Sequence, residues 1–216
     1  MPAEYYGKII YPLQDKVIPA FKDSPFYLTG GTALSRGYYN HRYSDDLDYF
    51  VNDHSDFQRI AERQVEKLRR MFDEIAIAIK GENYYRIFVG SERLKIEMVN
   101  DVPSHIGGMA EHPVLGRIDS KENILANKLT ALADRSLPKD IVDIYFLLKD
   151  GLSLKKALSD AESKAAGISP LLIAKIFAEF NYAILDPEIK WIMPLSGETI
   201  KRYLNTLSLS IVEGTI

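Results

Sequence analysis

The chain has 216 residues, enough for one large domain or two small ones with a buried core. Its 27 basic and 30 acidic residues leave a formal net charge of -3, so no overall basic field would recruit nucleic acid or a membrane surface. The chain has no cysteine, which excludes disulfides, thiolate zinc sites and a cysteine nucleophile. It also has no apolar run near the ~20 residues of a membrane span and no apolar leader at its start. We therefore expect a cytoplasmic protein with no membrane partner.

The first hundred residues predict a mixed β-sheet flanked by helices, an α/β or α+β arrangement. Apolar residues recur at helical spacing from Tyr5 to Phe21 and from Phe57 to Met71, the second helix with Ser55 as its expected cap. Alternating or apolar runs predict strands at residues 26–29, 46–51, 74–80, 84–89 and 93–99. Glycine-containing turns separate the last three segments, so we expect the sheet to end in a meander.

The second half of the chain predicts helices. Residues 103–113 read as a loop, and beyond Ser120 every signal is helical. Serine caps, helix-starting prolines and terminal glycines delimit helices that begin near residues 120, 138, 153, 170 and 196, the fourth of them reaching Tyr182. We therefore expect an α/β domain over residues 1–118 and a C-terminal helical domain over residues 119–216.

Three acidic residues fall on predicted strands. Asp46 and Asp48 are two residues apart, so both side chains leave the same face of the sheet, where two like charges repel. Glu97 alternates with Leu94, Ile96 and Met98 and faces opposite that apolar set. Carboxylate oxygens suit Mg²⁺. Three carboxylates on adjacent strands therefore predict a two-metal site for in-line phosphoryl or nucleotidyl transfer.

A glycine pair between a predicted strand and helix supplies a second signal. Gly30 and Gly31 allow close backbone approach to a phosphate, and a helix starting with Thr32 near its N-terminus offers unpaired N–H donors. Taken singly, a Gly-Gly pair is more often a turn, and an Asp-x-Asp pair is more often a loop or a solvated strand face. The two signals support each other because they occupy one strand–turn–helix–strand unit.

The combined pattern resembles the AbiEii/AbiGii toxin family of the nucleotidyltransferase superfamily. The resemblance rests first on GGTALSRGYYNHRYSDDLDYF, which holds both the glycine pair and the aspartates. LKIEMVN resembles the family strand with the third acid, and ENILANKLTALADRSLPKDIVDIYFLL resembles its helical motif. The resemblance covers Phe26 to Leu148. One departure is Lys139, where the family usually has arginine, so the planar bidentate geometry of a guanidinium is lost.

The resemblance implies roles for the residues at these positions. It implies that Asp46, Asp48 and Glu97 bind Mg²⁺ or Mn²⁺, with Glu97 as a further ligand or as the base for the incoming hydroxyl. It implies that Lys128 contacts the nucleotide phosphates and stabilises the pyrophosphate. The remaining implied nucleotide-binding residues are Gly30, Gly31, Thr32, Asp140 and Asp143. From the residues alone, Asp140 is equally well an ordinary acid in the first turn of a helix.

The function that the resemblance implies is transfer of NMP from an NTP to an acceptor hydroxyl, with release of pyrophosphate. It also implies a toxin role in a bacterial toxin–antitoxin or phage-defence pair, with RNA such as tRNA as a plausible acceptor and a cognate antitoxin as partner. Two alternatives stay open: a catalytically degenerate module that binds nucleotide or a partner, and an antibiotic nucleotidyltransferase of the aminoglycoside type. The second alternative differs from the toxin only in its acceptor.

Overall fold

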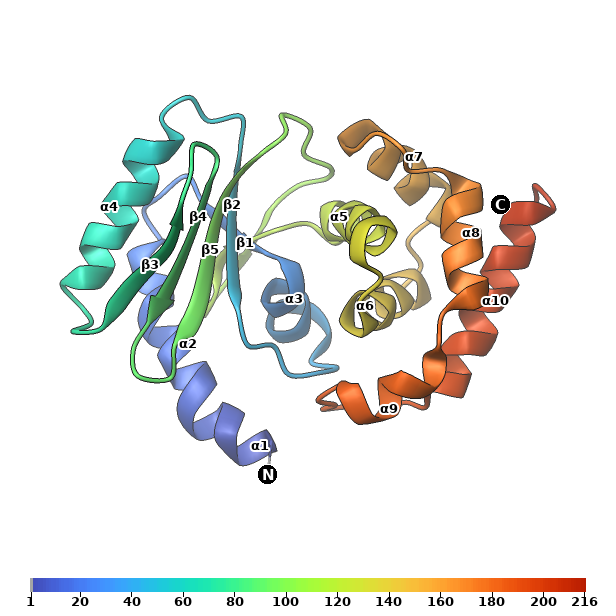
Figure 1. Ribbon diagram of the computed structural model, residues 1–216, viewed down its shortest axis with the longest axis horizontal. Coiled ribbons are helices and arrows are strands. Elements are labelled where there is room, and N and C mark those ends of the chain that lie inside the picture. Colours follow the sequence, from blue (N-terminus) through green and yellow to red (C-terminus); the bar gives the residue numbers. More distant parts are fainter. Residues whose placement is uncertain (1) are drawn as a thin grey trace. The chain divides into compact units, whose positions relative to one another are not determined.

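The computed structural model describes residues 2–216, which separate into two compact units. The first unit ends at Asp119 and the second begins at Ser120. Figure 1 shows the strands of the first unit and the helices of the second in chain order.

The first unit is built on a mixed sheet, which has seven strands over the described residues, in the order β3-β4-β5-β2-β1-β7-β6. Strands β2 and β5 run parallel to each other, as do β1 and β7, and the other neighbours are antiparallel. The strand bounds are β1 Tyr27–Thr29, β2 Leu47–Asn52, β3 Ile75–Lys80, β4 Tyr84–Val89, β5 Leu94–Asp101, β6 Ala110–His112 and β7 Gly116–Ile118. The predicted mixed sheet with a meander is confirmed.

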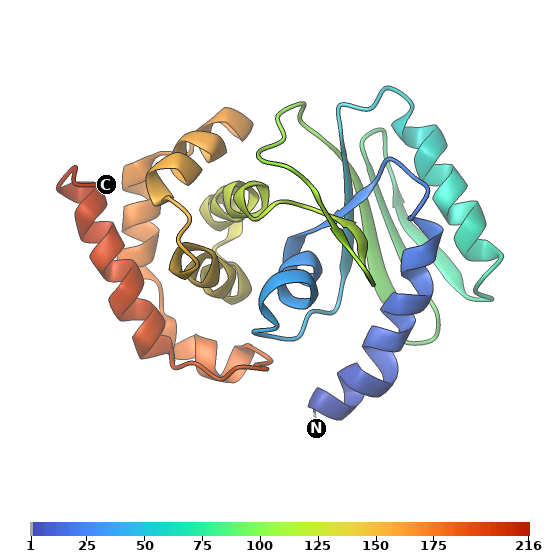
Figure 2. The same ribbon diagram turned by 180° about the vertical axis from the view of Figure 1, so that it is seen from behind.

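Helices cover both sides of this sheet. The N-terminal helix runs through α1 (Pro2–Tyr5), a π-helical segment (Tyr6–Ile10), α2 (Tyr11–Val17) and a 3₁₀ turn (Ile18–Ala20), and α4 spans Phe57–Arg69. Figures 1 and 2 show α2 and α4 on one side of the sheet and α3 (Gly30–Thr32) on the other. A π-helical segment, Ala33–Tyr39, continues α3.

Buried and partly exposed residues alternate along β2 and β5, so the two faces of the sheet differ in polarity. In β2, Leu47, Tyr49 and Val51 are buried, and the intervening residues are partly exposed. In β5, the predicted apolar set is likewise buried, with Ile96 and Met98 fully excluded from solvent. The apolar residues form the core beneath α2 and α4, so the acidic residues of both strands project from the opposite face.

The second unit is helical. Its helices are α5 (Lys121–Arg135), α6 (Pro138–Lys149), α7 (Leu154–Lys164), α8 (Pro170–Glu179), α9 (Leu185–Glu188) and α10 (Gly197–Val212). The hydroxyls of Ser120, Ser153 and Ser196 each accept a hydrogen bond from the backbone N–H three residues later, as predicted, and Ser169, before the predicted start at Pro170, does the same. Nowhere in residues 2–216 is a helix long and apolar enough to cross a membrane.

Three local expectations are wrong. Ser55 does not cap α4; Asp56 takes that position, without a side-chain cap. Residues 103–113 were expected as loop, yet β6 pairs with β7 through three residues per strand, too few for a visible alternation. The helix expected to reach Tyr182 ends at Glu179, where Phe180 turns to extended backbone. The helix after β1 begins at Gly30, with Thr29 as its cap, so Thr32 lies in its first turn, near the N-terminus as expected.

Candidate active site

The segment before β2 carries the first two acids and is held by buried polar contacts. The Gln14 side chain, which is fully buried in α2, donates to the backbone oxygens of Ser44 and Asp45 at 3.1 Å each. The Thr32 hydroxyl contacts the Ser44 hydroxyl at 2.9 Å and donates a short hydrogen bond to the backbone oxygen of Asp46. These contacts set the path of the chain into β2. The predicted role of Thr32 at a phosphate stays a prediction, because here its buried hydroxyl positions the acidic segment.

The sheet brings the three predicted acids together. Asp46 lies directly before β2, and Asp48 is the second residue of that strand. Glu97 of β5 is the register partner of Asp48 in the parallel β2–β5 pair, so both side chains project from the same face. The ammonium of Lys95 lies 2.9 Å from Oδ2 of Asp46 and 3.4 Å from Oε2 of Glu97. We call Asp46, Asp48 and Glu97 the acid cluster.

Glu97 is the most heavily bonded member of the acid cluster. Its Oε1 accepts hydrogen bonds from Arg86 Nε at 2.8 Å and from the Tyr84 hydroxyl, and Arg86 Nη2 lies 2.7 Å from the same oxygen. Burial opposes ionisation of the carboxyl, but the Tyr84 hydrogen bond and the charges of Lys95 and Arg86 outweigh burial and lower its pKa. Glu97 is therefore ionised at neutral pH.

The glycine pair lies against the same acids. Gly30 has a φ of +66°, a conformation that favours glycine, and a Cβ atom there would come within 2.5 Å of Oδ2 of Asp48. A Cβ at Gly31 would come within 2.6 Å of Nη2 of Arg42, a buried residue. The glycines therefore bring the start of α3 against the Asp48 carboxylate and the Arg42 guanidinium. This packing explains why two glycines stand together at this bend.

The acid cluster has the donor chemistry of a magnesium site. Asp46 and Asp48 offer hard carboxylate oxygens, and Mg²⁺ usually takes one or two carboxylates and completes its shell with water and phosphate. Glu97 already has both oxygens engaged by Tyr84, Arg86 and Lys95. Within residues 2–216, no group of three or more histidine or acidic side chains has the arrangement of a metal site. The residues thus fit a metal bound through the two aspartates, and the ligand assignment stays a prediction.

The second unit places the other three predicted residues in one buried group. Lys128 of α5 contacts Oδ1 of Asp140 at 2.7 Å and Oδ2 of Asp143 at 2.6 Å, both on α6. Both carboxylates are fully buried, and only 9% of the Lys128 side chain is exposed. Arg135 adds a contact from its Nε to Oδ2 of Asp140 at 3.3 Å. Asp140 is therefore not an ordinary solvated first-turn acid but one member of a buried ion-pair group.

The sequence patterns did not predict three residues that contact the acid cluster, namely Tyr84, Arg86 and Lys95. Lys95 could have been found, because it stands two residues before Glu97 and therefore on the same face of the predicted strand. Tyr84 and Arg86 reach Glu97 only through the antiparallel β4–β5 register, in which Arg86 is the partner of Glu97. No local pattern in the sequence reveals that register.

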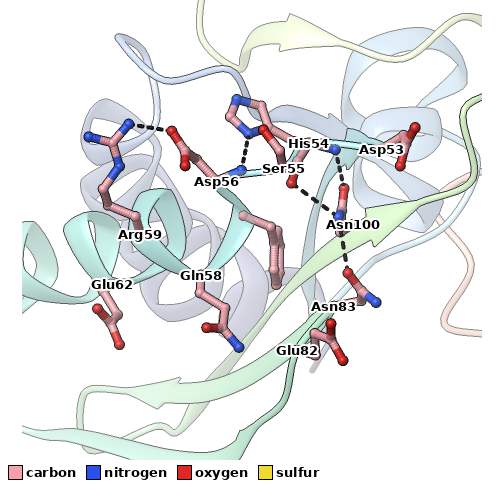
Figure 3. Close-up of a pocket in the computed structure, with 11 residues that line it drawn as sticks. Asp53, His54, Ser55, Asp56, Gln58, Arg59, Glu62, Glu82, Asn83 and Asn100 are labelled. Atoms are coloured by element: carbon pink, nitrogen blue, oxygen red, sulfur yellow. Dashed lines mark hydrogen bonds and ion pairs between the residues drawn. The ribbon is translucent and has the colours of Figure 1, made fainter.

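A polar pocket of about 640 Å³ lies elsewhere in the first unit, at the carboxyl ends of β2 and β5. Figure 3 shows Asp53, His54, Asn83 and Asn100 around it, with hydrogen bonds joining Asn100 to His54 and Asn83. Asp53 follows Asp48 by five residues along an extended strand, which corresponds to about 15 Å. The pocket contains none of the residues that the sequence predicted for chemistry.

Comparison with known proteins defines the class of this fold and site. A profile of the family described as "Nucleotidyl transferase AbiEii toxin, Type IV TA system" matches residues 13–191. The match extends beyond the Phe26–Leu148 segment that carries the motifs. The chain therefore belongs to the AbiEii family of nucleotidyltransferase toxins, and it is an enzyme that transfers nucleotidyl groups.

One curated relative and several solved structures are also similar to this chain. An uncharacterized protein of Aquifex aeolicus is 27% identical over 210 residues, covering 88% of this chain and 93% of the relative. JHP933 from Helicobacter pylori has a TM-score of 0.65 at 20% identity, with coverage of 95% of this chain and 91% of JHP933.

Two further similar structures are of proteins whose biological role is named, a toxin and an antibiotic-resistance factor. MenT4, a nucleotidyltransferase toxin of Mycobacterium tuberculosis, has a TM-score of 0.59 at 13% identity and covers 97% of this chain and 85% of its own. The antibiotic-resistance factor ANT(2'')-Ia has a TM-score of 0.53 at 16% identity, covering 70% of this chain and 89% of its own. At these identities the likenesses show the nucleotidyltransferase fold and leave the acceptor open.

Proposed function

We propose that this nucleotidyltransferase depends on a divalent cation, Mg²⁺ or Mn²⁺, and moves NMP from an NTP to a hydroxyl of RNA, with tRNA as one candidate. The observation that carries the proposal is the register pairing of Asp48 with Glu97, with Asp46 linked to Glu97 through Lys95. Carboxylates gathered in this way on neighbouring strands suit nucleotidyl transfer.

The proposed roles in the first unit follow from the contacts. Asp46 and Asp48 would hold the cation, which when bound stabilises the charge of the transferred phosphoryl group. The close approach of Asp48 to the backbone at Gly30 brings these ligands beside the start of α3, whose N–H groups suit phosphate oxygens. Glu97, with its lowered pKa, is a weak base, so an electrostatic and positioning role suits it better than proton abstraction.

In the second unit, the family resemblance supports Lys128 as a phosphate contact. The structure adds that the Lys128 ammonium is held by two buried carboxylates, those of Asp140 and Asp143. These carboxylates hold the ammonium in one orientation, as a residue that stabilises developing phosphate charge requires. We propose that Asp140 and Asp143 act through Lys128 and do not contact the nucleotide.

The toxin role implies a partner. The family description names a type IV toxin–antitoxin system, which supports a cognate antitoxin for this chain. Co-expression of the chain with a neighbouring small open reading frame, scored by growth, tests this part of the proposal. Relief of growth arrest without any loss of the chain itself is the expected result.

The test of the enzyme proposal is incubation with each α-labelled NTP, Mg²⁺ and total RNA. Label in an RNA band is expected, removal of divalent cations should abolish it, and Asp48→Asn should lower it at least about 10³-fold. Asp53→Asn is the matched control, because the same change lies at the far end of β2, at a φ of +45° that asparagine tolerates. Label confined to protein or to a small molecule would refute the RNA acceptor, and full activity of Asp48→Asn would refute the site.

A further inference from the structure

The acid cluster already contains a cation that belongs to the chain. The Lys95 ammonium lies 2.9 Å from a carboxylate oxygen of Asp46 and 3.4 Å from one of Glu97. About a quarter of the Lys95 side chain (27%) is exposed, so its charge is only partly screened by water. Lys95 thus bridges two of the three acids expected to share divalent cations.

The position of Lys95 follows from the strand that carries it. Lys95 and Glu97 are two residues apart on β5, so both side chains project from the acidic face of the sheet. The parallel β2–β5 pairing places Asp48 beside Glu97, and Asp46 lies two residues earlier in the chain. A flexible lysine side chain can therefore reach the carboxylates of both strands.

Glu97 is anchored so that one oxygen is left for Lys95. Arg86 contacts Oε1 of Glu97 through two nitrogens, at 2.8 and 2.7 Å, and the Tyr84 hydroxyl donates to the same atom. Oε2 is the oxygen that Lys95 approaches. These charge-assisted contacts, all to one oxygen, restrict the orientation of the carboxylate. The geometry thus uses Glu97 to hold Lys95 beside Asp46.

We propose that Lys95 occupies one of the two cation positions of the acid cluster, so that the cluster takes up one divalent cation, through Asp46 and Asp48, and not two. The inference rests on the metal dependence in the proposed function. It replaces the two-metal site expected from three acids by one divalent cation and one built-in ammonium. Because like charges repel at short range, the ammonium also weakens binding of the divalent cation beside it.

The test measures binding of Mn²⁺ alone to the full chain. Titration calorimetry gives the number of bound ions and their affinity, and the electron paramagnetic resonance signal gives the concentration of free Mn²⁺. Wild type should bind one Mn²⁺ per chain. Lys95→Met, similar in length but uncharged, should bind a second Mn²⁺ or bind the first about tenfold more tightly or better. Lys95→Arg, which keeps the charge, should behave as wild type. Lys80→Met is the matched control, because Lys80 lies on β3, away from the acid cluster, and pairs with the exposed Glu62 of helix α4.

Thermal unfolding of the same variants gives a second readout. In EDTA, Lys95→Met should melt below wild type because its acids repel, and Mn²⁺ should raise its melting temperature more than that of wild type. Adding Asp46→Asn to Lys95→Met should remove the gain in Mn²⁺ binding, which assigns the gain to the cluster.

Three outcomes would overturn the inference. Two equivalent Mn²⁺ ions on wild type would do so, as would unchanged Mn²⁺ number and affinity in Lys95→Met. Absence of Mn²⁺ binding in every variant would overturn both the inference and the metal dependence of the proposed function. Failure of the transferase proposal itself is recognised separately, by full transfer activity of Asp48→Asn.

Discussion

At the scale of single residues, the site depends on two glycines, Gly30 and Gly31, whose lack of a side chain makes room for Asp48 and Arg42. Gly30 combines a positive φ with a position where the Asp48 carboxylate leaves no room for a Cβ atom. A glycine signature in such enzymes is usually explained by access for phosphate. In this chain the packing of Asp48 and Arg42 against the two glycines gives a second reason that acts before any ligand binds.

Gly30→Ala should therefore damage both stability and activity. The methyl group strains the backbone and displaces Asp48, so we expect a loss of about 1–3 kcal/mol in the free energy of unfolding, together with a large loss of transfer activity. Urea unfolding and the labelled-NTP assay measure the two effects. Gly7→Ala is the control, since its added Cβ meets no other part of the protein within 4 Å; its stability should stay the same or rise by up to about 1 kcal/mol, because Gly7 lies in a helical segment. Equal stability of Gly30→Ala and wild type would contradict the packing argument.

Residue-scale effects of pH are clearest at Tyr182 in the second unit. Its buried hydroxyl donates to the backbone oxygen of Phe177 at 2.7 Å, and burial raises its pKa. A tyrosine whose pKa is higher in the folded than in the unfolded protein contributes its full stabilisation below the unfolded pKa of about 10. As the pH rises from there toward the folded pKa, this contribution is lost progressively, because the unfolded chain ionises first.

The stability difference between Tyr182→Phe and wild type should show this pH dependence. At pH 7 we expect the variant to be about 1 kcal/mol less stable, because one buried hydrogen bond is lost. As pH rises above about 10 the difference should shrink, since only the wild type must keep a tyrosine neutral. Urea unfolding from pH 7 to 11 measures the difference. A constant difference across that range would refute the assignment.

At the scale of elements, helices α5 and α6 are joined by a buried charged group. Lys128 lies on one helix and both of its partners, Asp140 and Asp143, on the other. Removing one member of such a group leaves uncompensated buried charge, which costs far more than the pair contributes over an apolar replacement. A role for Lys128 in catalysis therefore cannot be read from loss of activity alone.

Lys128→Met should destabilise the protein by about 3–5 kcal/mol. The triple variant Lys128→Met/Asp140→Asn/Asp143→Asn should recover much of that stability, because it removes the unpaired charges. Chemical unfolding measures stability, and the labelled-NTP assay measures activity. If Lys128 contacts phosphate, the triple variant stays inactive although it is folded. Recovery of activity along with stability would assign Lys128 a structural role only.

At the scale of the whole molecule, the proposed substrate and cation should be visible as added stability. A ligand that binds only the folded state at 100 times its Kd adds about 2.7 kcal/mol to the free energy of unfolding. We expect such a gain with an NTP and Mg²⁺ together, measured by chemical unfolding, and a much smaller gain in Asp48→Asn. An equal gain in both proteins would show that the nucleotide binds away from the acid cluster.

Much of this architecture is encoded in short stretches of sequence. Alternation over six to eight residues defined β2, β4 and β5, and three serines with Pro138 and Pro170 marked helix starts in the second unit. The order of the glycine pair, the Asp-x-Asp segment and the lysine helix was enough to indicate the nucleotidyltransferase family. These features are readable because helix and strand periods and caps depend only on neighbours along the chain.

Only the tertiary structure decided which charges meet. Arg86 joins Glu97 through strand register, and Lys95 reaches Asp46 across two strands that are far apart in sequence. The burial of Asp140 likewise depends on how α6 packs on α5. Charge pairing across strands and helices is set by packing between distant segments, so the sequence determined which acids are present and the fold determined which cation each one holds.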